Sequence, residues 1–399
     1  MMKQSNPRIR FKEFNNKWGN YKLGQLGIFK SGIGFSDSQQ GGTEGIPFFK
    51  VSDMNNIGNE TEMRNANNYV TQEQIMKNSW KVINETPAII FAKVGAALML
   101  NRKRLVTKPF LIDNNTMSYS LNKSWDKDFG LTLFHTIDLP KYAQIGALPS
   151  YNASDIATIK VNVPSIQEQS AIGSLFHTLD DLLVSYKDNF ANFQSLKAAM
   201  LYKMFPKAGQ TVPEIRLDGF EGEWEEKQFS KLVKRVTKSS DSDSLPKVEF
   251  EDIISGQGRL NKDISSKFDN RKGIHFKPGY TLYGKLRPYL NNWLLPKFEG
   301  VALGDFWVFD PNGNNSDFIY YLVQSSCYQK VANDTSGTKM PRSDWKSVST
   351  TIFAIPKTIA EQQAIGAYFY NLDNLINSYQ EKISQFETLK KKLLQDMFI

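Results

Sequence analysis

Residues 168–205 read EQSAIGSLFHTLDDLLVSYKDNFANFQSLKAAMLYKMF, and residues 361–398 read EQQAIGAYFYNLDNLINSYQEKISQFETLKKKLLQDMF. The two stretches align without a gap at a constant offset of 193, and 17 of their 38 positions are identical. Self-similarity at a fixed offset is the sequence signature of a repeated structural unit. The chain therefore contains two copies of one unit, and each copy ends in a long helix.

Both stretches have the start signal of a helix and the periodicity of a coiled coil. Ser165 with Glu168, and Thr358 with Glu361, have the spacing of capping boxes, in which a hydroxyl and a carboxylate each accept from a free backbone N–H. Apolar residues then recur every three and four positions, which is the seam of a coiled coil. The predicted seam residues are Ile172, Phe176, Leu179, Leu183, Tyr186 and Phe193 in the first copy, and Ile365, Phe369, Leu372, Ile376, Tyr379 and Phe386 in the second.

A lysine interrupts the apolar seam at the same place in both copies, Lys197 and Lys390. Two interpretations of this lysine stand open. Its aliphatic stem can lie along the seam while the ammonium stays in water. Alternatively, the charge fixes the register or the choice of partner, as single polar residues do in coiled coils.

The repeat also marks the start of each unit, and the region between start and helix is not repeated. Residues 7–18 resemble residues 213–224, including Trp18 and Trp224. We expect an α+β protein in which two α/β domains lie at opposite ends of an antiparallel coiled coil, with a pseudo-twofold internal repeat. The expected segments are a first domain at 1–163, a first long helix at 164–206, a second domain at 207–355 and a second long helix at 356–399.

Several apolar runs in the variable regions predict strands. Residues 47–53 are expected to form a strand that enters a turn, and residues 88–95 a buried strand that ends in a glycine turn. Residues 280–288 fit the same place in the second domain. Residues 301–309 are expected to form one further strand.

Composition favours a folded protein without disulfides. The chain has 399 residues, of which 40% are hydrophobic and 13% aromatic, and a net charge of +8. The single Cys327 excludes a disulfide framework, and three scattered histidines (His135, His177 and His275) argue against a metal site. The N-terminus lacks the apolar segment of a secretory signal, and no run is long enough to span a membrane. We expect a cytoplasmic protein, and its basic charge is compatible with nucleic-acid binding.

Catalytic motifs are missing from the sequence. Residues 279–286 superficially resemble a phosphate-binding loop, but Leu286 replaces the required Ser or Thr. The Asn-Pro-Pro-Tyr/Phe tetrad of adenine methyltransferases does not occur, nor do the H-E-x-x-H and G-x-S-x-G motifs. The chain is expected to catalyse no reaction alone and to bind neither metal nor cofactor.

Basic and polar residues near predicted turns are the candidates for contact with DNA. The densest cluster, at 102–104 with Lys108, is either a solvated loop or a set of phosphate contacts. Lys93 and Lys285 follow matching strands, where they are either surface lysines of a turn or DNA ligands. The full set of candidates is Lys50, Ser52, Asn55, Lys93, Arg102, Lys103, Arg104, Lys108, Lys285, Arg287, Tyr289, Lys339 and Arg342.

This architecture resembles the specificity subunits of type I restriction–modification systems. The resemblance lies in two capped helices that begin with Glu-Gln and end with Met-Phe, each after a variable region of about 140 residues. The segments FFKVSDMNN, IIFAKVGAAL, TLYGKLRPYL and GFEGEWEEKQFSKL are similar to recurring pieces of that family's target-recognition domains.

The resemblance implies a division of labour with other subunits. Each domain would read one half of a split site in double-stranded DNA, and the helices would set the gap between the halves. Methylation subunits, expected to number two, would bind S-adenosylmethionine and pack on the helices. A motor–nuclease subunit would bring ATP and magnesium for cleavage.

Two other classes of function stay open from the residues alone. One is a coiled-coil scaffold whose α/β domains bind protein or carbohydrate. The other is a nuclease or methyltransferase with an unrecognised active site.

Overall fold

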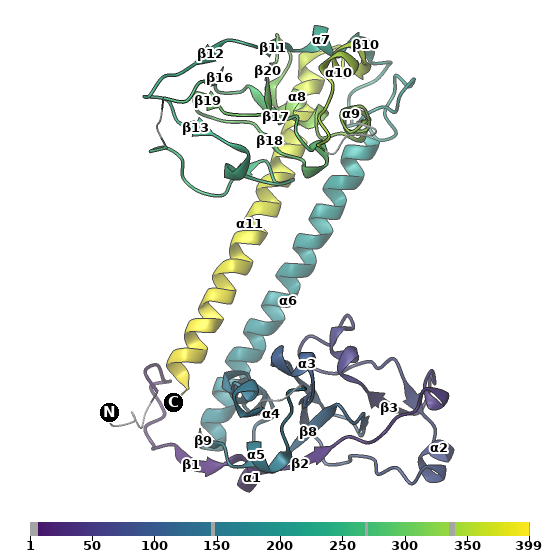
Figure 1. Cartoon of the computed structure of the whole chain (residues 1–399), viewed down its shortest axis with the longest axis vertical. Helices are drawn as coiled ribbons and strands as arrows, with labels where there is room; N and C mark the ends of the chain where they lie inside the picture. Colours follow the sequence, from purple (N-terminus) through teal and green to yellow (C-terminus); the bar gives the residue numbers. More distant parts are fainter. Residues whose placement is uncertain (1–6, 145–147, 268–269, 335–339, 399) are drawn as a thin grey trace. The chain divides into compact units, whose positions relative to one another are not determined.

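The computed structural model describes residues 7–144, 148–267, 270–334 and 340–398, and Figure 1 traces the chain. The chain divides into two compact units, each of which we describe separately. Unit 1 comprises residues 1–187 and 382–399, and unit 2 comprises residues 188–381. Both long helices are shared between the units, so these units cut across the predicted boundaries at 163, 206 and 355. No helix among the described residues is long and apolar enough to cross a membrane.

Unit 1 contains a four-stranded antiparallel sheet and a smaller three-stranded sheet, whose strands alternate along the chain. The four strands run in the order β2-β8-β5-β6: Gly27–Ser31, Thr116–Leu121, Ala88–Ala92 and Lys103–Val106. The three strands run in the order β4-β3-β7: Tyr69–Val70, Ile46–Phe49 and Leu111–Ile112. The short helices are α1 (Leu23–Leu26), α2 (Gln72–Lys77), α3 (Ala96–Met99), α4 (Lys127–Thr136) and α5 (Ala153–Ala157). The predicted buried strand is confirmed as β5, since all five of its residues are buried.

Unit 2 repeats the central sheet with a different surrounding. Its sheet β11-β20-β17-β18 consists of Lys234–Val236, Phe306–Asp310, Thr281–Gly284 and Trp293–Leu294. A second sheet, β12-β16-β19-β13, consists of Ser239–Ser240, Gly273–Phe276, Gly300–Ala302 and Lys247–Val248. A hairpin joins β14 (Ile253–Ile254) to β15 (Arg259–Leu260), and the short helices are α7 (Phe229–Leu232), α8 (Ser316–Leu322), α9 (Ser326–Ala332) and α10 (Trp345–Thr350). Strands β17 and β5 occupy the same position in their respective sheets.

The prediction of a single strand over residues 301–309 is wrong. The segment forms β19 and β20, which belong to two different sheets. Gly304 separates them with a φ of +85°, a left-handed conformation that glycine adopts without steric cost. The strand is interrupted at this glycine because the chain leaves one sheet there and enters the other.

Each variable region is closed by a pair of strands from its two ends. In unit 1, β1 (Gly19–Lys22) pairs antiparallel with β9 (Lys160–Val163), directly before the long helix α6. In unit 2, β10 (Glu225–Gln228) pairs in the same way with β21 (Ile352–Ile355), directly before α11. The repeated frame predicted from the sequence is therefore present in both units.

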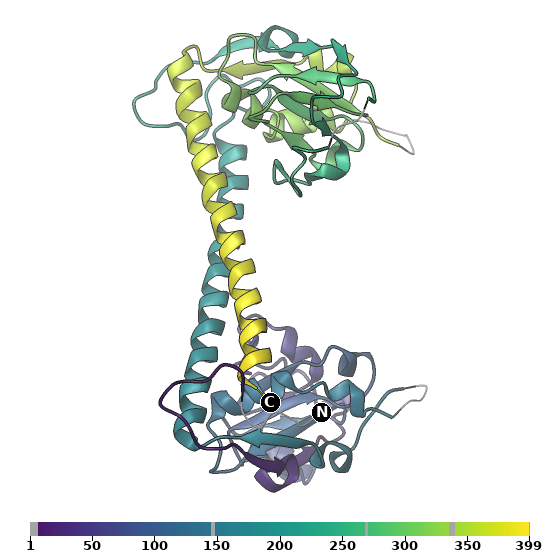
Figure 2. The same ribbon diagram turned by 90° about the vertical axis from the view of Figure 1, so that its left-hand side faces the viewer.

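The long helices α6 (Ile166–Lys203) and α11 (Ile359–Met397) run antiparallel within each unit (Figure 2). In unit 1 the rings of Tyr186 and Phe386 lie 5.3 Å apart, and in unit 2 those of Phe193 and Tyr379 lie 5.4 Å apart. All of the predicted seam residues are buried or half-buried in the two helices. Buried members are Ile172, Phe176, Leu179, Leu183, Ile365, Phe369 and Leu372, and half-buried members are Tyr186, Phe193, Ile376, Tyr379 and Phe386.

The glutamates that open the helices anchor the start of each repeat. In unit 1, Arg10 donates two hydrogen bonds to Glu168, at 2.6 and 2.8 Å, and the Trp18 indole N–H donates to the same carboxylate. In unit 2, Arg216 and Trp224 make the same contacts with Glu361. The hydroxyl half of each predicted capping box is present, at Ser165 and Thr358. The glutamate half is engaged differently, since a guanidinium is a stronger partner for a buried carboxylate than a neutral N–H.

The glycines after the helix starts let the long helices approach α4 and α8 closely. An added Cβ on Gly173 would lie 2.5 Å from Asp126 Oδ1 and 2.7 Å from the Phe129 backbone nitrogen. An added Cβ on Gly366 would lie 2.9 Å from Asn315 Oδ1 in the equivalent place. Both contacts are with the cap of the adjacent helix, because Asp126 caps α4 and Asn315 caps α8.

The lysines within the seam do not have their ammonium groups in water. Lys197 Nζ lies 2.6 Å from Asp373 Oδ1, and both side chains are mostly buried. Lys390 pairs with Asp180 in the same manner. The solvated interpretation is therefore wrong for both lysines, since each has a carboxylate partner on the opposite helix.

Candidate nucleic-acid interface

Two equivalent loops follow β5 in unit 1 and β17 in unit 2. We call them loop 93–102 and loop 285–292. The backbone oxygen of Lys93 accepts from Tyr151 N–H, and its N–H donates to Asn115 O. The backbone of Lys285 makes the equivalent two hydrogen bonds with Ser343 N–H and Asp305 O. Lys93 and Lys285 therefore occupy matching positions in the two sheets, as the sequence predicted.

A proline-containing segment pairs with each loop. Gly95 N donates to Pro149 O at 2.9 Å, and Arg287 N donates to Pro341 O at 2.7 Å. The bridges Val94–Ser150 and Leu286–Arg342 lie beside these bonds. The two units thus share these backbone hydrogen bonds and bridges, while the side chains of their loops differ.

Basic groups of unit 2 converge on one carboxylate, that of Asp305. Lys285 Nζ lies 3.6 Å from Asp305 Oδ1, and Arg342 Nη2 lies 2.8 Å from Asp305 Oδ2. Arg287 and Tyr289 are exposed in the same loop. The structure therefore brings four of the five predicted residues of this unit together, and Lys339 falls outside the described residues.

The predicted cluster at 102–104 does not form a solvated loop. Lys103 lies in β6 with a relative exposure of 1%, and its ammonium donates to Asn101 Oδ1 and Ile137 O, each at 2.7 Å. Burial lowers the pKa of Lys103 to about 8. Arg104, also in β6, donates to the backbone oxygens of Asn59 and Met54, and its burial lowers the pKa of the guanidinium. Lys103 is therefore not accessible to a phosphate, and the interpretation of this residue as a DNA contact is wrong.

The remaining candidates of unit 1 lie on or near the surface. Arg102 donates to Asn55, so the structure brings these two candidates together. The Lys50 ammonium donates to Gln40 Oε1 at 3.1 Å, next to the exposed Ser52 of the short 3-10 helix Val51–Asn55. Lys93 is half-buried, and Lys108 is exposed.

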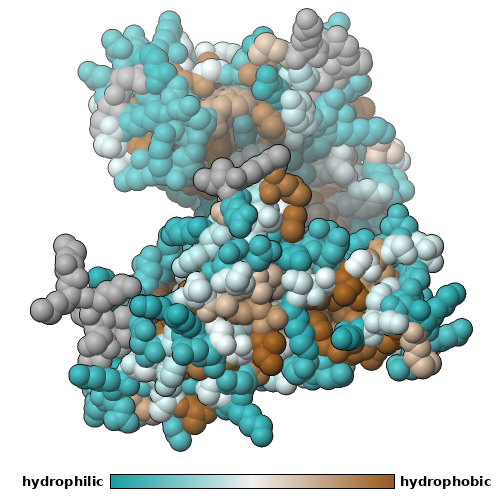
Figure 3. Space-filling model, turned by 60° about the horizontal axis from the view of Figure 1, so that its bottom comes forward, coloured by the Kyte–Doolittle hydropathy of each residue, from teal (hydrophilic) through white to brown (hydrophobic). Residues whose placement is uncertain are grey.

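Large apolar side chains are exposed beside both loops. The most exposed are Leu148 in unit 1, at 61%, and Tyr289 in unit 2, at 57%. Met340 of unit 2 holds the place of Leu148, since each directly precedes the proline that pairs with its loop. Figure 3 brings the surface of unit 1 forward and shows hydrophobic residues between hydrophilic ones. Exposed apolar groups next to cations suit a surface that contacts base edges as well as phosphates.

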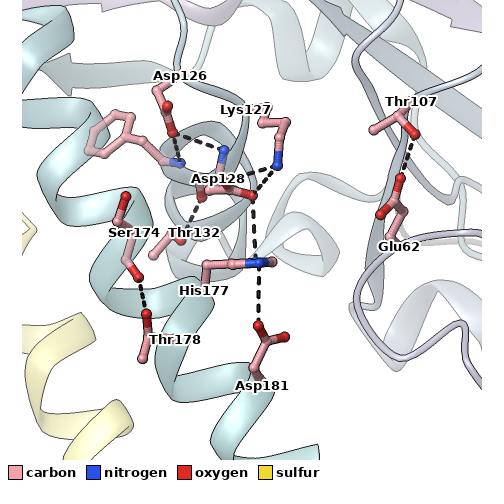
Figure 4. Close-up of polar contacts among 11 residues, drawn as sticks. Glu62, Thr107, Asp126, Lys127, Asp128, Thr132, Ser174, His177, Thr178 and Asp181 are labelled. Carbon is pink, nitrogen blue, oxygen red and sulfur yellow. Dashed lines mark hydrogen bonds and ion pairs between the residues drawn. The ribbon is translucent and has the colours of Figure 1, made fainter.

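Polar contacts attach α4 to α6 in unit 1 (Figure 4). His177 of α6 lies between Asp128 Oδ1, at 3.8 Å, and Asp181 Oδ2, at 3.4 Å. Lys127 donates to Asp128, and Asp126 caps the helix by accepting from two backbone N–H groups. Of these contacts, the one between His177 and Asp128 joins α6 to α4, while the others lie within a single helix. Within the described residues, no group of three or more His, Cys, Asp or Glu side chains is arranged to hold a metal ion.

The helices carry an exposed leucine pair in each unit, which the sequence interpretation did not single out. Lys187 and Glu387 each directly follow a seam residue, and they form an ion pair at 2.7 Å on one side of the helix pair. The residues that directly precede a seam residue therefore lie on the other side of the helix pair from Lys187 and Glu387. In unit 1 these are Leu182 and Leu389, which are 37% and 43% exposed.

The equivalent positions of unit 2 are Leu375 and Leu196, which are 38% and 37% exposed. Both pairs are related by the offset of 193. Identity at exposed positions of the repeat was the available sequence signal for this surface.

Residues 15–189 and 223–388 match the family of type I restriction modification DNA specificity domains. The chain is similar to the crystal structure of the S subunit of the type I restriction-modification system from M. genitalium, with a TM-score of 0.61, 14% identity and 99% of each chain covered. A structure described as the basis of complex assembly and conformational transition of the type I R-M system matches with a TM-score of 0.52, 12% identity, and coverage of 94% of this chain and 96% of that chain. No curated protein matches the sequence.

The two matched segments cover most of the chain, so the chain belongs to the family of type I restriction–modification DNA specificity domains and contains two copies of the domain. It is a DNA-recognition subunit of such a system. A coiled-coil scaffold with protein- or carbohydrate-binding domains is not favoured.

Proposed function

We propose that the chain reads a bipartite DNA site, with unit 1 recognising one half and unit 2 the other. The observation that carries this proposal is the pair of equivalent loops, which share backbone partners but differ in side chains. Loop 93–102 is mainly apolar up to Leu100, whereas loop 285–292 carries Lys285, Arg287 and Tyr289. A common frame with different chemistry suits two unlike half-sites.

The long helices are proposed to set the gap between the half-sites. Each is continuous over 38 or 39 residues, about 57 Å at 1.5 Å per residue. A helix of fixed length is a suitable spacer, because its backbone hydrogen bonds resist stretching.

Two methylation subunits are proposed to dock on the two exposed leucine pairs, Leu182 with Leu389 and Leu375 with Leu196. The pairs are equivalent by the internal repeat, so one kind of partner surface fits both. These leucines are apolar and partly exposed, so a partner that covers them gains the free energy of burying apolar surface.

We propose that the chain itself catalyses no reaction. S-adenosylmethionine would be carried by the methylation subunits, and ATP and magnesium by motor–nuclease subunits. This division is consistent with the missing catalytic motifs in the sequence.

Reconstitution tests the proposal directly. Purified methylation subunits, S-adenosylmethionine and DNA fragments that contain many candidate sites are combined with and without this chain. We expect site-specific adenine methylation only when all components are present. Methylation by the chain alone, or identical methylation without it, would contradict the proposal.

A further inference from the structure

Arg287 has a backbone conformation that is unusual for a residue with a side chain. Its φ is +47°, in the left-handed region, where the Cβ crowds the following carbonyl oxygen. The equivalent residue of unit 1 is Gly95, with a φ of +77°. Unit 2 therefore holds an arginine where unit 1 has a glycine, and the two residues differ in ψ, which is +62° at Arg287 and −166° at Gly95.

The surrounding backbone fixes this conformation from several sides. Arg287 N donates to Pro341 O, and Arg287 O accepts from Leu290 N at 2.8 Å. The far end of the loop is held by Gly256 N, which donates to Asn291 O at 3.0 Å. Residues in sparsely populated conformations persist where the surrounding structure over-determines them, and they concentrate at functional sites.

The guanidinium of Arg287 is exposed and unengaged, in contrast to its neighbours. Lys285 and Arg342 share the carboxylate of Asp305. Within the described parts of the chain, the Arg287 side chain makes neither a hydrogen bond nor an ion pair. A rigid backbone thus presents five free N–H donors next to exposed Tyr289 and Met340.

We propose that Arg287 is a specificity-determining residue that recognises a guanine in the half-site read by unit 2, an inference that rests on the proposed function. The planar fork of the guanidinium matches guanine O6 and N7 in the major groove. Lysine at this position would keep the charge but lose the bidentate geometry.

Two substitutions separate base reading from phosphate contact and from a structural role. Arg287→Gly removes the side chain and relieves the left-handed strain, so the melting temperature should equal or exceed that of the wild type. Arg287→Lys retains the charge. With both variants we expect discrimination at one base pair of one half-site to fall by about 5- to 150-fold, while the other half-site is read normally.

The matched control is Asn312→Gly. Asn312 is another residue of unit 2 in the left-handed region, with a φ of +50°. This substitution should leave base preference unchanged. The measurement is sequencing of methylated adenines from a randomised DNA library, using the reconstituted complex. If Arg287→Lys behaves as the wild type and Arg287→Gly weakens all sequences equally, Arg287 contacts a phosphate and the proposal is wrong.

A lower melting temperature of Arg287→Gly with unchanged base preference would assign the residue a structural role and also overturn the proposal. Failure of the wild-type complex to methylate any bipartite site would instead contradict the proposed function.

Discussion

Lys197 of α6 pairs with Asp373 of α11, and the internal repeat produces the same relationship between Lys390 and Asp180. In unit 2, Lys197 Nζ also lies 3.1 Å from Gln324 Oε1, and Tyr321 donates its hydroxyl to Asp373 at 2.9 Å. The pair therefore links both helices to α8 and the loop that follows it. A charge at one level of an apolar seam penalises any other alignment, so we infer that the two pairs fix the antiparallel register.

Removal of one member of this pair should destabilise unit 2. Asp373→Asn leaves the Lys197 ammonium mostly buried without a counter-charge, and we expect a loss of about 1–3 kcal/mol in the free energy of unfolding. Urea denaturation monitored by circular dichroism measures this loss. The control is Glu387→Gln, which removes the partner of the exposed Lys187 and should cost at most about 0.5 kcal/mol. Equal effects of the two substitutions would contradict the assigned role.

Gly173→Ala should destabilise unit 1, although alanine is the better helix former. Alanine within a helix gains about 1 kcal/mol over glycine. Here its Cβ would contact the cap of α4 at 2.5 Å from Asp126 Oδ1. We expect a net loss of about 1–3 kcal/mol, as for other overpacked sites. Ser174→Ala, one residue further on an exposed face, should change stability by less than about 0.5 kcal/mol; a stabilised Gly173→Ala protein would show that the helices are not in close contact.

The sequence was sufficient to predict the long helices, their seam and the equivalence of β5 and β17, because these features follow from local periodicity and from the repeat. It was not sufficient for the partners of polar groups. Asp180 and Asp373 are identical in the two copies, yet their contact with the lysines depends on antiparallel alignment of residues far apart in the chain. Glu168 was assigned to its own helix cap for the same reason, since Arg10 lies 158 positions away.

Lys103 shows where prediction of the candidate site from sequence fails. Three consecutive basic residues suggested a solvated loop, but β6 pairs with β5 and turns Lys103 inward. Burial depends on strand register, and a basic run does not reveal its register. The exposed left-handed position of Arg287 likewise follows from the tertiary contacts of its loop.

The burial of Lys103 predicts that the free energy of unfolding depends on pH. Its pKa is lowered from 10.5 to about 8 in the folded protein, so the unfolded chain binds more protons between these pH values. Stability contributed at this site should therefore rise between pH 8 and 10.5. Relative to Lys103→Met, the wild type should gain about 2 kcal/mol over this range. Lys108→Met, at an exposed position, serves as the control and should show no such gain; parallel curves for wild type and Lys103→Met would refute the assignment.

Substitution of the exposed leucines should remove partner subunits one at a time. Leu182→Ser with Leu389→Ser should weaken one docking site by about 1–2 kcal/mol, or about 5- to 30-fold. Leu375→Ser with Leu196→Ser should affect the other site equally. Native mass spectrometry of the assembled complex counts bound methylation subunits, and circular dichroism checks that the helices are intact. Retention of both partners by the fourfold variant would exclude this surface.

The central claim is that the two units read separate half-sites, and exchange of one domain tests it most directly. Residues 19–163, which run from β1 to β9, are replaced by the corresponding segment of another specificity subunit. Genome-wide mapping of methylated adenines then compares cells that carry the wild type, the exchange variant or neither. We predict a bipartite motif for the wild type and a change confined to one half of that motif in the variant. A change in both halves, or a methylation pattern that does not depend on this chain, would contradict the account.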